Sequence, residues 1–179
     1  MANKDTYEAE DIVKGYSNES ELQKPEEAIL NNFKNKLREM RMLDIGVGGG
    51  RTTLHFAPLV KEYVGIDYSQ NMIKSCKKRF INFNKNISFE TCDVRNMNIF
   101  KDNHFDFILF SFNGIDYISQ KDRLTALSEI KRVCKNGGHF CFSTHNLHSI
   151  DKIFRIQLSA NPIKVLKNLL RYILLKLIN

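Results

Sequence analysis

The stretch "MLDIGVGGGRTT", residues 42–53, joins a short apolar run to a loop that holds four of the chain's nine glycines. Glycine lets a backbone turn tightly and lets a ligand approach the main chain. A glycine loop that follows a strand commonly binds an anion, yet Asp44 stands just before the glycines. A carboxylate there would repel a pyrophosphate and attract a cation. The loop therefore favours a ligand that carries positive charge.

The glycine spacing argues against two common phosphate-binding loops. A dinucleotide-binding loop has the pattern G-x-G-x-x-G, whereas this chain has G-V-G-G-G-R from Gly46, with Arg51 in place of the last glycine. A P-loop ends in Gly-Lys-Ser/Thr, and this stretch does not. A nucleoside that carries ammonium and sulfonium charges satisfies both the glycines and Asp44.

The composition indicates one folded domain with a hydrophobic core. The chain has 179 residues, of which 42% are hydrophobic and 26% charged, and this suits a globular protein. The four cysteines lack metal-ligand spacing, so we expect reduced thiols, no metal and a cytoplasmic protein. The N-terminal stretch has no apolar core of a secretory signal, and no stretch has the length of a membrane span.

Five apolar runs predict strands, and helical patterns separate them. We expect strands at 41–46, 62–67, 87–93, 105–112 and 137–145. We expect helices over 25–40, 52–60, 69–83 and 121–134, with a turn at "KNGG", 135–138, that stops the last of them. Strands that alternate with helices predict an α/β fold with a parallel sheet. The functional residues of such a sheet lie at the carboxyl ends of its strands.

Two more acids stand at predicted strand ends. Asp67 ends the second strand, where a carboxylate can accept hydrogen bonds from both ribose hydroxyls. Tyr68 can lie against a purine face. Asp93 ends the third strand, where it can accept from an exocyclic adenine amine. Solvated strand ends or helix caps are the alternative interpretation of the two acids.

Taken together, these motifs resemble those of class I S-adenosylmethionine-dependent methyltransferases. "LDIGVGGG" is similar to the family's first motif, D-x-G-x-G-x-G, "VGIDYSQNMI" to its acidic ribose motif and "CDVRNM" to its adenine motif. "FDFILFSF" and "LSEIKRVCKNGGHFCFSTHN" are similar to its fourth strand and to its following helix, turn and fifth strand. The resemblance covers about residues 41–146. It implies a three-layer Rossmann-like fold and S-adenosyl-L-methionine as cofactor.

The resemblance also implies a cofactor-binding role for individual residues of this chain. The methionine moiety would lie on the loop, at Asp44, Gly46, Gly48 and Gly50, with Ser111 and Phe112 beneath it. Asp67 would hold the ribose, Tyr68 the adenine face, and Asp93 with Val94 the adenine edge.

Methyl transfer needs alignment of the reacting atoms and exclusion of water, and an oxygen acceptor also needs a base. Asp116 and His145, in the loops after the fourth and fifth strands, are the candidate catalytic residues. A turn residue and a loop histidine without a chemical role are the alternatives. In the N-terminal segment, Tyr7 and Tyr16 either close over the cofactor or are ordinary surface or packing tyrosines.

The stretch after the fourth strand bears on the methyl acceptor. Enzymes that methylate the amino groups of nucleic-acid bases have Asn/Asp-Pro-Pro-Tyr there, whereas this chain has "SFNGIDY", residues 111–117. The chain is more similar to small-molecule methyltransferases, including sugar and surface-polysaccharide enzymes. We therefore expect O-methylation of a small hydroxylated acceptor and no nucleic acid. The alternative is a catalytically incomplete module that binds the cofactor and needs a partner chain.

The C-terminal segment departs from the family pattern. The family's sheet usually has seven strands, but the residues after Asn146 do not predict two more, so a shortened, five-stranded sheet is expected. Residues 150–179 hold six basic residues and one acid, which is most of the net charge of +7. This segment predicts a basic amphipathic helix. It can pack on the sheet, pair with a second copy or a partner chain, or lie on a membrane surface. The expected organisation is an N-terminal helical segment (1–40), a core (41–149) and this tail (150–179).

Overall fold

A computed structural model describes residues 4–83 and 86–146 of the chain. Contacts divide the chain into two units, residues 1–144 and 145–179. The predicted tail helix lies outside the described residues. Among the helices of the described part, none is long and apolar enough to cross a membrane.

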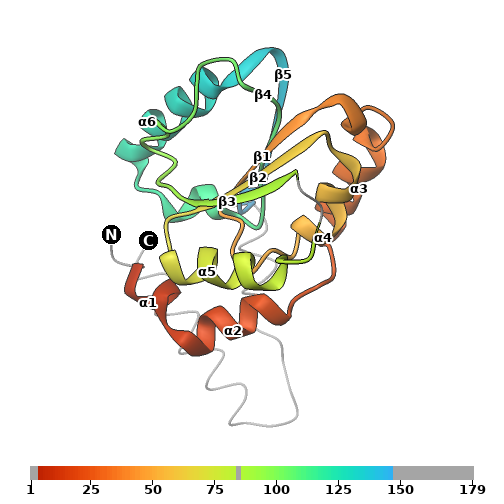
Figure 1. The fold of residues 1–179 in the computed structure, drawn as a ribbon. Coiled ribbons are helices and arrows are strands. Elements are labelled where there is room, and N and C mark those ends of the chain that lie inside the picture. The colour runs from red at the N-terminus through yellow and green to blue at the C-terminus, as the bar shows by residue number, and fades with distance from the viewer. Residues whose placement is uncertain (1–3, 84–85, 147–179) are drawn as a thin grey trace, which may run out of the picture. The chain divides into compact units, whose positions relative to one another are not determined.

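Five parallel strands form one sheet in the order β3-β2-β1-β4-β5 (Figure 1). Their bounds are Arg41–Ile45 for β1, Glu62–Asp67 for β2, Ile87–Thr91 for β3, Phe105–Phe110 for β4 and Cys134–Phe142 for β5. The predicted α/β fold with a five-stranded parallel sheet is confirmed. Because β1 lies between β2 and β4, the strand order reverses beside the glycine loop, at the position where open α/β sheets bind ligands.

Helices cover both faces of this sheet. In Figure 1, α6 lies on one face, and α4 and α5 lie on the other. The helices are α1 (Lys4–Glu8), α2 (Glu10–Asn18), α3 (Lys24–Phe33), α4 (Thr53–Phe56), α5 (Gln70–Arg79) and α6 (Gln120–Val133). Short 3₁₀ helices are η1 (Leu37–Glu39), η2 (Ala57–Leu59) and η3 (Gly114–Tyr117). The predicted helices over 25–40 and 52–60 are therefore each split into an α-helical and a 3₁₀ segment.

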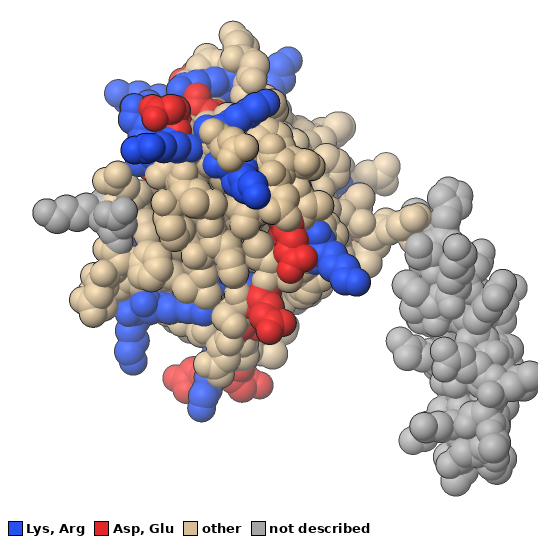
Figure 2. All heavy atoms as spheres, turned by 90° about the vertical axis from the view of Figure 1, so that its right-hand side faces the viewer, with Lys and Arg blue, Asp and Glu red and all other residues tan. Residues whose placement is uncertain are grey.

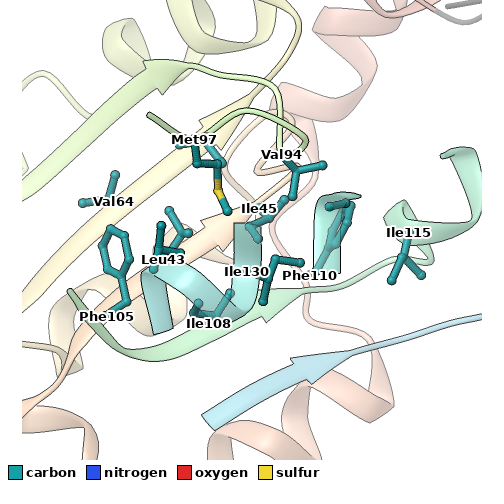
Figure 3. Packing of buried hydrophobic residues seen from close by; sticks show 13 residues of the cluster. Leu43, Ile45, Val64, Val94, Met97, Phe105, Ile108, Phe110, Ile115 and Ile130 are labelled. Carbon is teal, nitrogen blue, oxygen red and sulfur yellow. The ribbon is translucent and has the colours of Figure 1, made fainter. Parts of the chain in front are cut away.

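The central strand supplies side chains to two separate cores, since successive side chains of a strand point to opposite faces. Leu43 and Ile45 belong to the core under α6, together with Ile130 of that helix (Figure 3). Met42 belongs to the core on the other face, together with Phe56 of α4. Three residues of the first core also line the cavity described below: Ile45, Val94 and Phe110. The packing of this core therefore sets the position of the cavity floor.

The predicted turn at 135–138 is wrong, because these residues belong to β5. The strand begins at Cys134, directly after α6. Its register against β4 shifts: Cys134 lies opposite Phe105, and His139 lies opposite Phe107. The extra residues bulge out of the ladder, and Gly137 adopts a φ of 79°, which glycine tolerates without strain. The two glycines therefore shape an irregularity inside the strand and not a turn before it.

Candidate functional site

A cavity of about 670 Å³ lies at the carboxyl ends of the strands. Residues at the ends of four strands contribute to its lining: Ile45 of β1 with Gly46 and Gly48 after it, Asp67 and Tyr68 at the end of β2, Asp93 and Val94 after β3, and Ser111 and Phe112 after β4. Tyr7 and Tyr16 of the N-terminal helices also line it. Among the predicted cofactor residues, the lining thus includes Gly46, Gly48, Asp67, Tyr68, Asp93, Val94 and Ser111. It does not include Asp44 or Gly50.

Asp44 anchors the end of β1 instead of facing the cavity. Its side chain is buried, and Oδ2 accepts hydrogen bonds from Thr52 Oγ1 and from the Tyr63 hydroxyl, both at 2.5 Å. Burial raises the pKa of this carboxyl to about 6, although the two hydroxyls act in the opposite direction. Asp44 is therefore not among the residues that line the cavity, and its part in holding the methionine moiety stays a prediction.

The four glycines of the loop divide into two pairs. Gly46 and Gly48 line the cavity with φ angles of 67° and 54°, which are conformations that favour glycine. Gly50 serves packing, because a Cβ there would lie 2.4 Å from the Phe80 ring of the segment after α5. Gly49 lets α2 approach, because a Cβ there would lie 2.3 Å from the backbone carbonyl of Tyr16. Only half of the glycine motif therefore faces the cavity.

Asp67 joins the glycine loop to the end of β2. The Gly48 N–H donates to Asp67 Oδ2 at 3.0 Å, and the Ser69 N–H donates to Oδ1 at 2.9 Å. Burial raises the pKa of this carboxyl above its usual value, while these backbone donors oppose the rise. A carboxylate offers about four acceptor positions, so Asp67 retains acceptor capacity toward hydroxyls in the cavity.

Asp93 is bound by an arginine that the sequence interpretation did not single out. Arg95 donates to Asp93 through its backbone N–H at 2.9 Å and through Nη2 at 2.6 Å, and its Nη1 donates to Asp122 of α6 at 2.8 Å. Arg95 and Asp122 also line the cavity. An aspartate that accepts from the amide two residues on is a common turn, so this spacing was the available signal. Asp93 therefore lines the cavity as one partner of an ion pair with Arg95.

The N-terminal helices place aromatic rings over the cavity. The Tyr7 ring lies edge-on to those of Tyr16, Tyr68 and Tyr117, with each centroid 6.0 Å away. Burial raises the pKa of Tyr68 to about 12, so its hydroxyl is neutral at physiological pH. Tyr7 and Tyr16 thus lie where a covering role requires, and all four rings line the cavity.

Hydrogen bonds attach these helices to α5. Glu8 accepts from the backbone N–H groups of Gln70 and Asn71 at 2.9 and 3.0 Å, and a carboxylate at a helix N-terminus is favoured by the exposed N–H groups there. The Ser17 and Ser75 hydroxyls are 2.6 Å apart. The N-terminal segment is therefore part of the wall of the cavity.

The two candidate catalytic residues lie in different units of the chain. Asp116 is half-buried in η3 and lines the cavity, and its Oδ1 accepts from Thr144 Oγ1 at 2.7 Å. His145 is exposed and begins the second unit. Of the two predicted catalytic residues, Asp116 is thus the one that lies in the unit that holds the cavity.

Comparison with known proteins gives a family match over the region just described. A family model described as "Methyltransferase domain" matches residues 42–138. The chain is 31% identical over 111 residues to the "Uncharacterized methyltransferase YcgJ" of Bacillus subtilis (strain 168), a match that covers 60% of this chain and 41% of that protein. The chain spans less than half the length of the curated relatives it matches.

Solved structures share the fold. The crystal structure of YcgJ has a TM-score of 0.61 at 27% identity, over 69% of this chain and 51% of that chain. The PH0226 protein from Pyrococcus horikoshii OT3 has a TM-score of 0.65 at 19% identity, over 84% and 73%. The N-methyltransferase NodS from Bradyrhizobium japonicum WM9 has a TM-score of 0.58 at 20% identity, over 79% and 70%.

The close approach of α2 to the loop predicts the effect of adding one methyl group. We expect Gly49→Ala to lower the free energy of unfolding by about 1–3 kcal/mol, because the methyl meets backbone atoms that cannot rotate away. Gly15→Ala is the matched control: it lies in α2 in open space and should stabilise the helix by about 0.5–1 kcal/mol. Urea unfolding followed by circular dichroism measures both. Equal effects would contradict the contact between α2 and Gly49.

The raised pKa of Asp44 predicts a pH dependence of stability. The folded state binds this proton more tightly than the unfolded state, in which the pKa is about 3.9. The stabilisation present at low pH is therefore lost as pH rises from about 4 through about 6. We expect the free energy of unfolding of the wild type, relative to Asp44→Asn, to fall by roughly 3 kcal/mol across this window. A difference that stays constant from pH 4 to 7 would show that Asp44 titrates normally.

Proposed function

The chain belongs to the methyltransferase domain family, and we propose that it is an S-adenosylmethionine-dependent methyltransferase. One observation carries the proposal: a glycine loop, a buried acid and an acid beside an apolar residue meet in one cavity, at the ends of β1, β2 and β3. Such groups can bind a nucleoside that carries a charged amino-acid side chain, because the two acids accept hydrogen bonds from its ribose and its base and the glycine loop leaves room for the side chain. The cofactor would supply a methyl group activated by a sulfonium.

The residues present fit each part of this cofactor. Asp67 retains acceptor capacity for the ribose hydroxyls, and Tyr68 and Val94 offer an aromatic and an aliphatic surface for the adenine. Gly46 and Gly48 present backbone without side chains to the methionine moiety. Asp93 would accept from the adenine amine while it remains paired with Arg95.

Asp44 contributes charge to this site without touching the ligand. With a pKa of about 6, the carboxyl is ionised at neutral pH. Its distance from solvent keeps its field weakly screened, so the negative charge beneath the loop favours a cationic group above it. Asp44, at the start of the glycine motif, thus favours binding of the proposed cofactor through long-range electrostatic attraction and not through direct contact.

We further propose that the acceptor is a small hydroxylated molecule, such as a sugar, and that Asp116 is the base. Asp116 lines the cavity with the polar side chains Ser119 and Gln120, and these suit a hydroxyl-rich ligand. On the face that Figure 2 shows, Lys and Arg side chains lie among Asp and Glu side chains. That face therefore does not carry the basic stripe that a nucleic-acid-binding face requires.

Calorimetric titration with S-adenosylhomocysteine tests the cofactor assignment. We expect saturable binding, no binding of NAD, and an affinity about 10- to 100-fold weaker for Asp67→Asn, because hydrogen bonds to a charged acceptor are lost. Asp102→Asn is the matched control, since Asp102 pairs with Arg132 and does not line the cavity. Binding of NAD with no binding of S-adenosylhomocysteine would refute the proposed function.

Asp116→Asn tests the proposed base. If transfer of a labelled methyl group to a sugar acceptor is observed, we expect this variant to lower kcat by about 10²- to 10⁴-fold, the usual contribution of a general base. Its affinity for S-adenosylhomocysteine should stay within twofold of the wild type. A kcat that is unchanged at neutral pH would remove Asp116 from the chemistry.

A further inference from the structure

Phe112, the second residue after β4, has an unusual backbone conformation for its residue type. Its φ is 55°, and that of Asn113 is 57°. A residue other than glycine in this region carries a cost of about 1–3 kcal/mol and persists only where its surroundings fix it. The Asn113 N–H donates to Ser143 Oγ at 2.8 Å, which fixes one side of this turn. The Phe112 ring itself lines the cavity and is 42% exposed.

A guanidinium fixes the other side of the turn. Arg51 Cζ lies 5.2 Å from the centroid of the Phe112 ring, within the range of a cation–π interaction. The Tyr16 ring meets the same ring edge-on at 6.4 Å. Tyr16 also contacts Gly48, because a Cβ on that glycine would lie 3.4 Å from Tyr16 Cδ1. The Phe112 ring is therefore held beside the glycine loop.

Arg51 is itself held by a buried carboxylate. Arg51 Nη2 donates to Glu26 Oε1 at 2.8 Å, and Arg51 Nη1 contacts Glu26 Oε2. Nη1 also donates to the backbone carbonyl of Glu21 at 3.2 Å. Arg51 is 9% exposed and Glu26 is 2% exposed. Such a two-point contact fixes the plane of the guanidinium.

Stability alone is a weak reason for this ion pair. A buried pair is often no more stable than apolar side chains of the same volume, because removing two charges from water is costly. Neither Arg51 nor Glu26 lines the cavity. Arg51 nevertheless contacts Phe112, which does line the cavity, and Glu26 holds Arg51 in place.

We propose that Arg51 and Glu26 are positioning residues that hold Phe112 against the part of the cavity beside the glycine loop. This inference rests on the proposed function, in which the amino-acid moiety of the cofactor lies beside that loop. The pair acts through Phe112 and sets affinity for the amino-acid moiety. The nucleoside end, at Asp67 and Tyr68, does not depend on it.

Two ligands separate these ends of the cavity. S-adenosylhomocysteine carries the amino-acid moiety, whereas 5′-methylthioadenosine has the same nucleoside without it. We expect Arg51→Lys, which keeps the charge but loses the planar fork, to weaken binding of S-adenosylhomocysteine about tenfold. Its affinity for methylthioadenosine should change less than twofold. Glu26→Gln should give the same selective loss.

Arg132→Lys is the matched control, because Arg132 makes a similar two-point contact with Glu129 on α6 and should leave both affinities unchanged. Phe112→Leu removes the ring and should mimic Arg51→Lys, whereas Phe112→Tyr keeps the ring and should bind as the wild type does. If Arg51 acts through Phe112, the double variant Arg51→Lys with Phe112→Leu should be no weaker than either single variant. Circular dichroism confirms that each variant is folded at the titration temperature, and the Phe112 variants carry the test if Arg51→Lys does not fold.

Equal loss of both ligands, or unchanged affinity for both, would overturn the positioning role. Additive effects in the double variant would show that Arg51 does not act through Phe112. A wild type that binds methylthioadenosine but not S-adenosylhomocysteine would likewise overturn it. A wild type that binds neither ligand would refute the proposed function itself, and that result is distinct from the others.

Discussion

The hydrogen bond from the Gly48 amide to the Asp67 carboxylate is the interaction on which the arrangement of the site depends. It links the loop after β1 to the end of β2, so the conformation of each segment depends on the position of the other. The loop then needs positive φ angles at three of its glycines. In that conformation two glycines face the cavity, and the other two allow neighbouring segments to approach closely. The hydrogen bond between Gly48 and Asp67 thus belongs to a loop conformation in which two glycines face the cavity and the other two serve packing.

The sequence was sufficient for the sheet and for much of the cavity lining, because those features depend on local pattern. Apolar runs that alternate with helices predicted the five strands, and polar residues at strand ends predicted positions such as Asp67 and Tyr68. The irregularity in β5 was not predictable from "KNGG", since two glycines indicate either a turn or a bulge and only the partner strand decides between them.

Partners that are distant in sequence account for what the sequence analysis missed. Asp44 was expected at the methionine moiety because a carboxylate beside the glycines attracts a cation, but its buried side chain accepts from Thr52 and from Tyr63 on the adjacent strand. Arg51 appeared only as a misfit to a glycine pattern, and its carboxylate partner lies in α3. In both cases a charged side chain is paired across the fold. A local pattern gives the charged residue but not the group that binds it from across the fold.

Tyr7 and Tyr16 line the cavity from outside the range that the family model matches, which starts at residue 42. The residues that identify the family and some of the residues that shape the cavity therefore lie in different stretches of the sequence. The glycine loop and the strand-end acids identify the family. Substitutions in α1 and α2 can alter the cavity without changing that match. Two relatives that align equally well over the matched range can thus differ in the ligands they select.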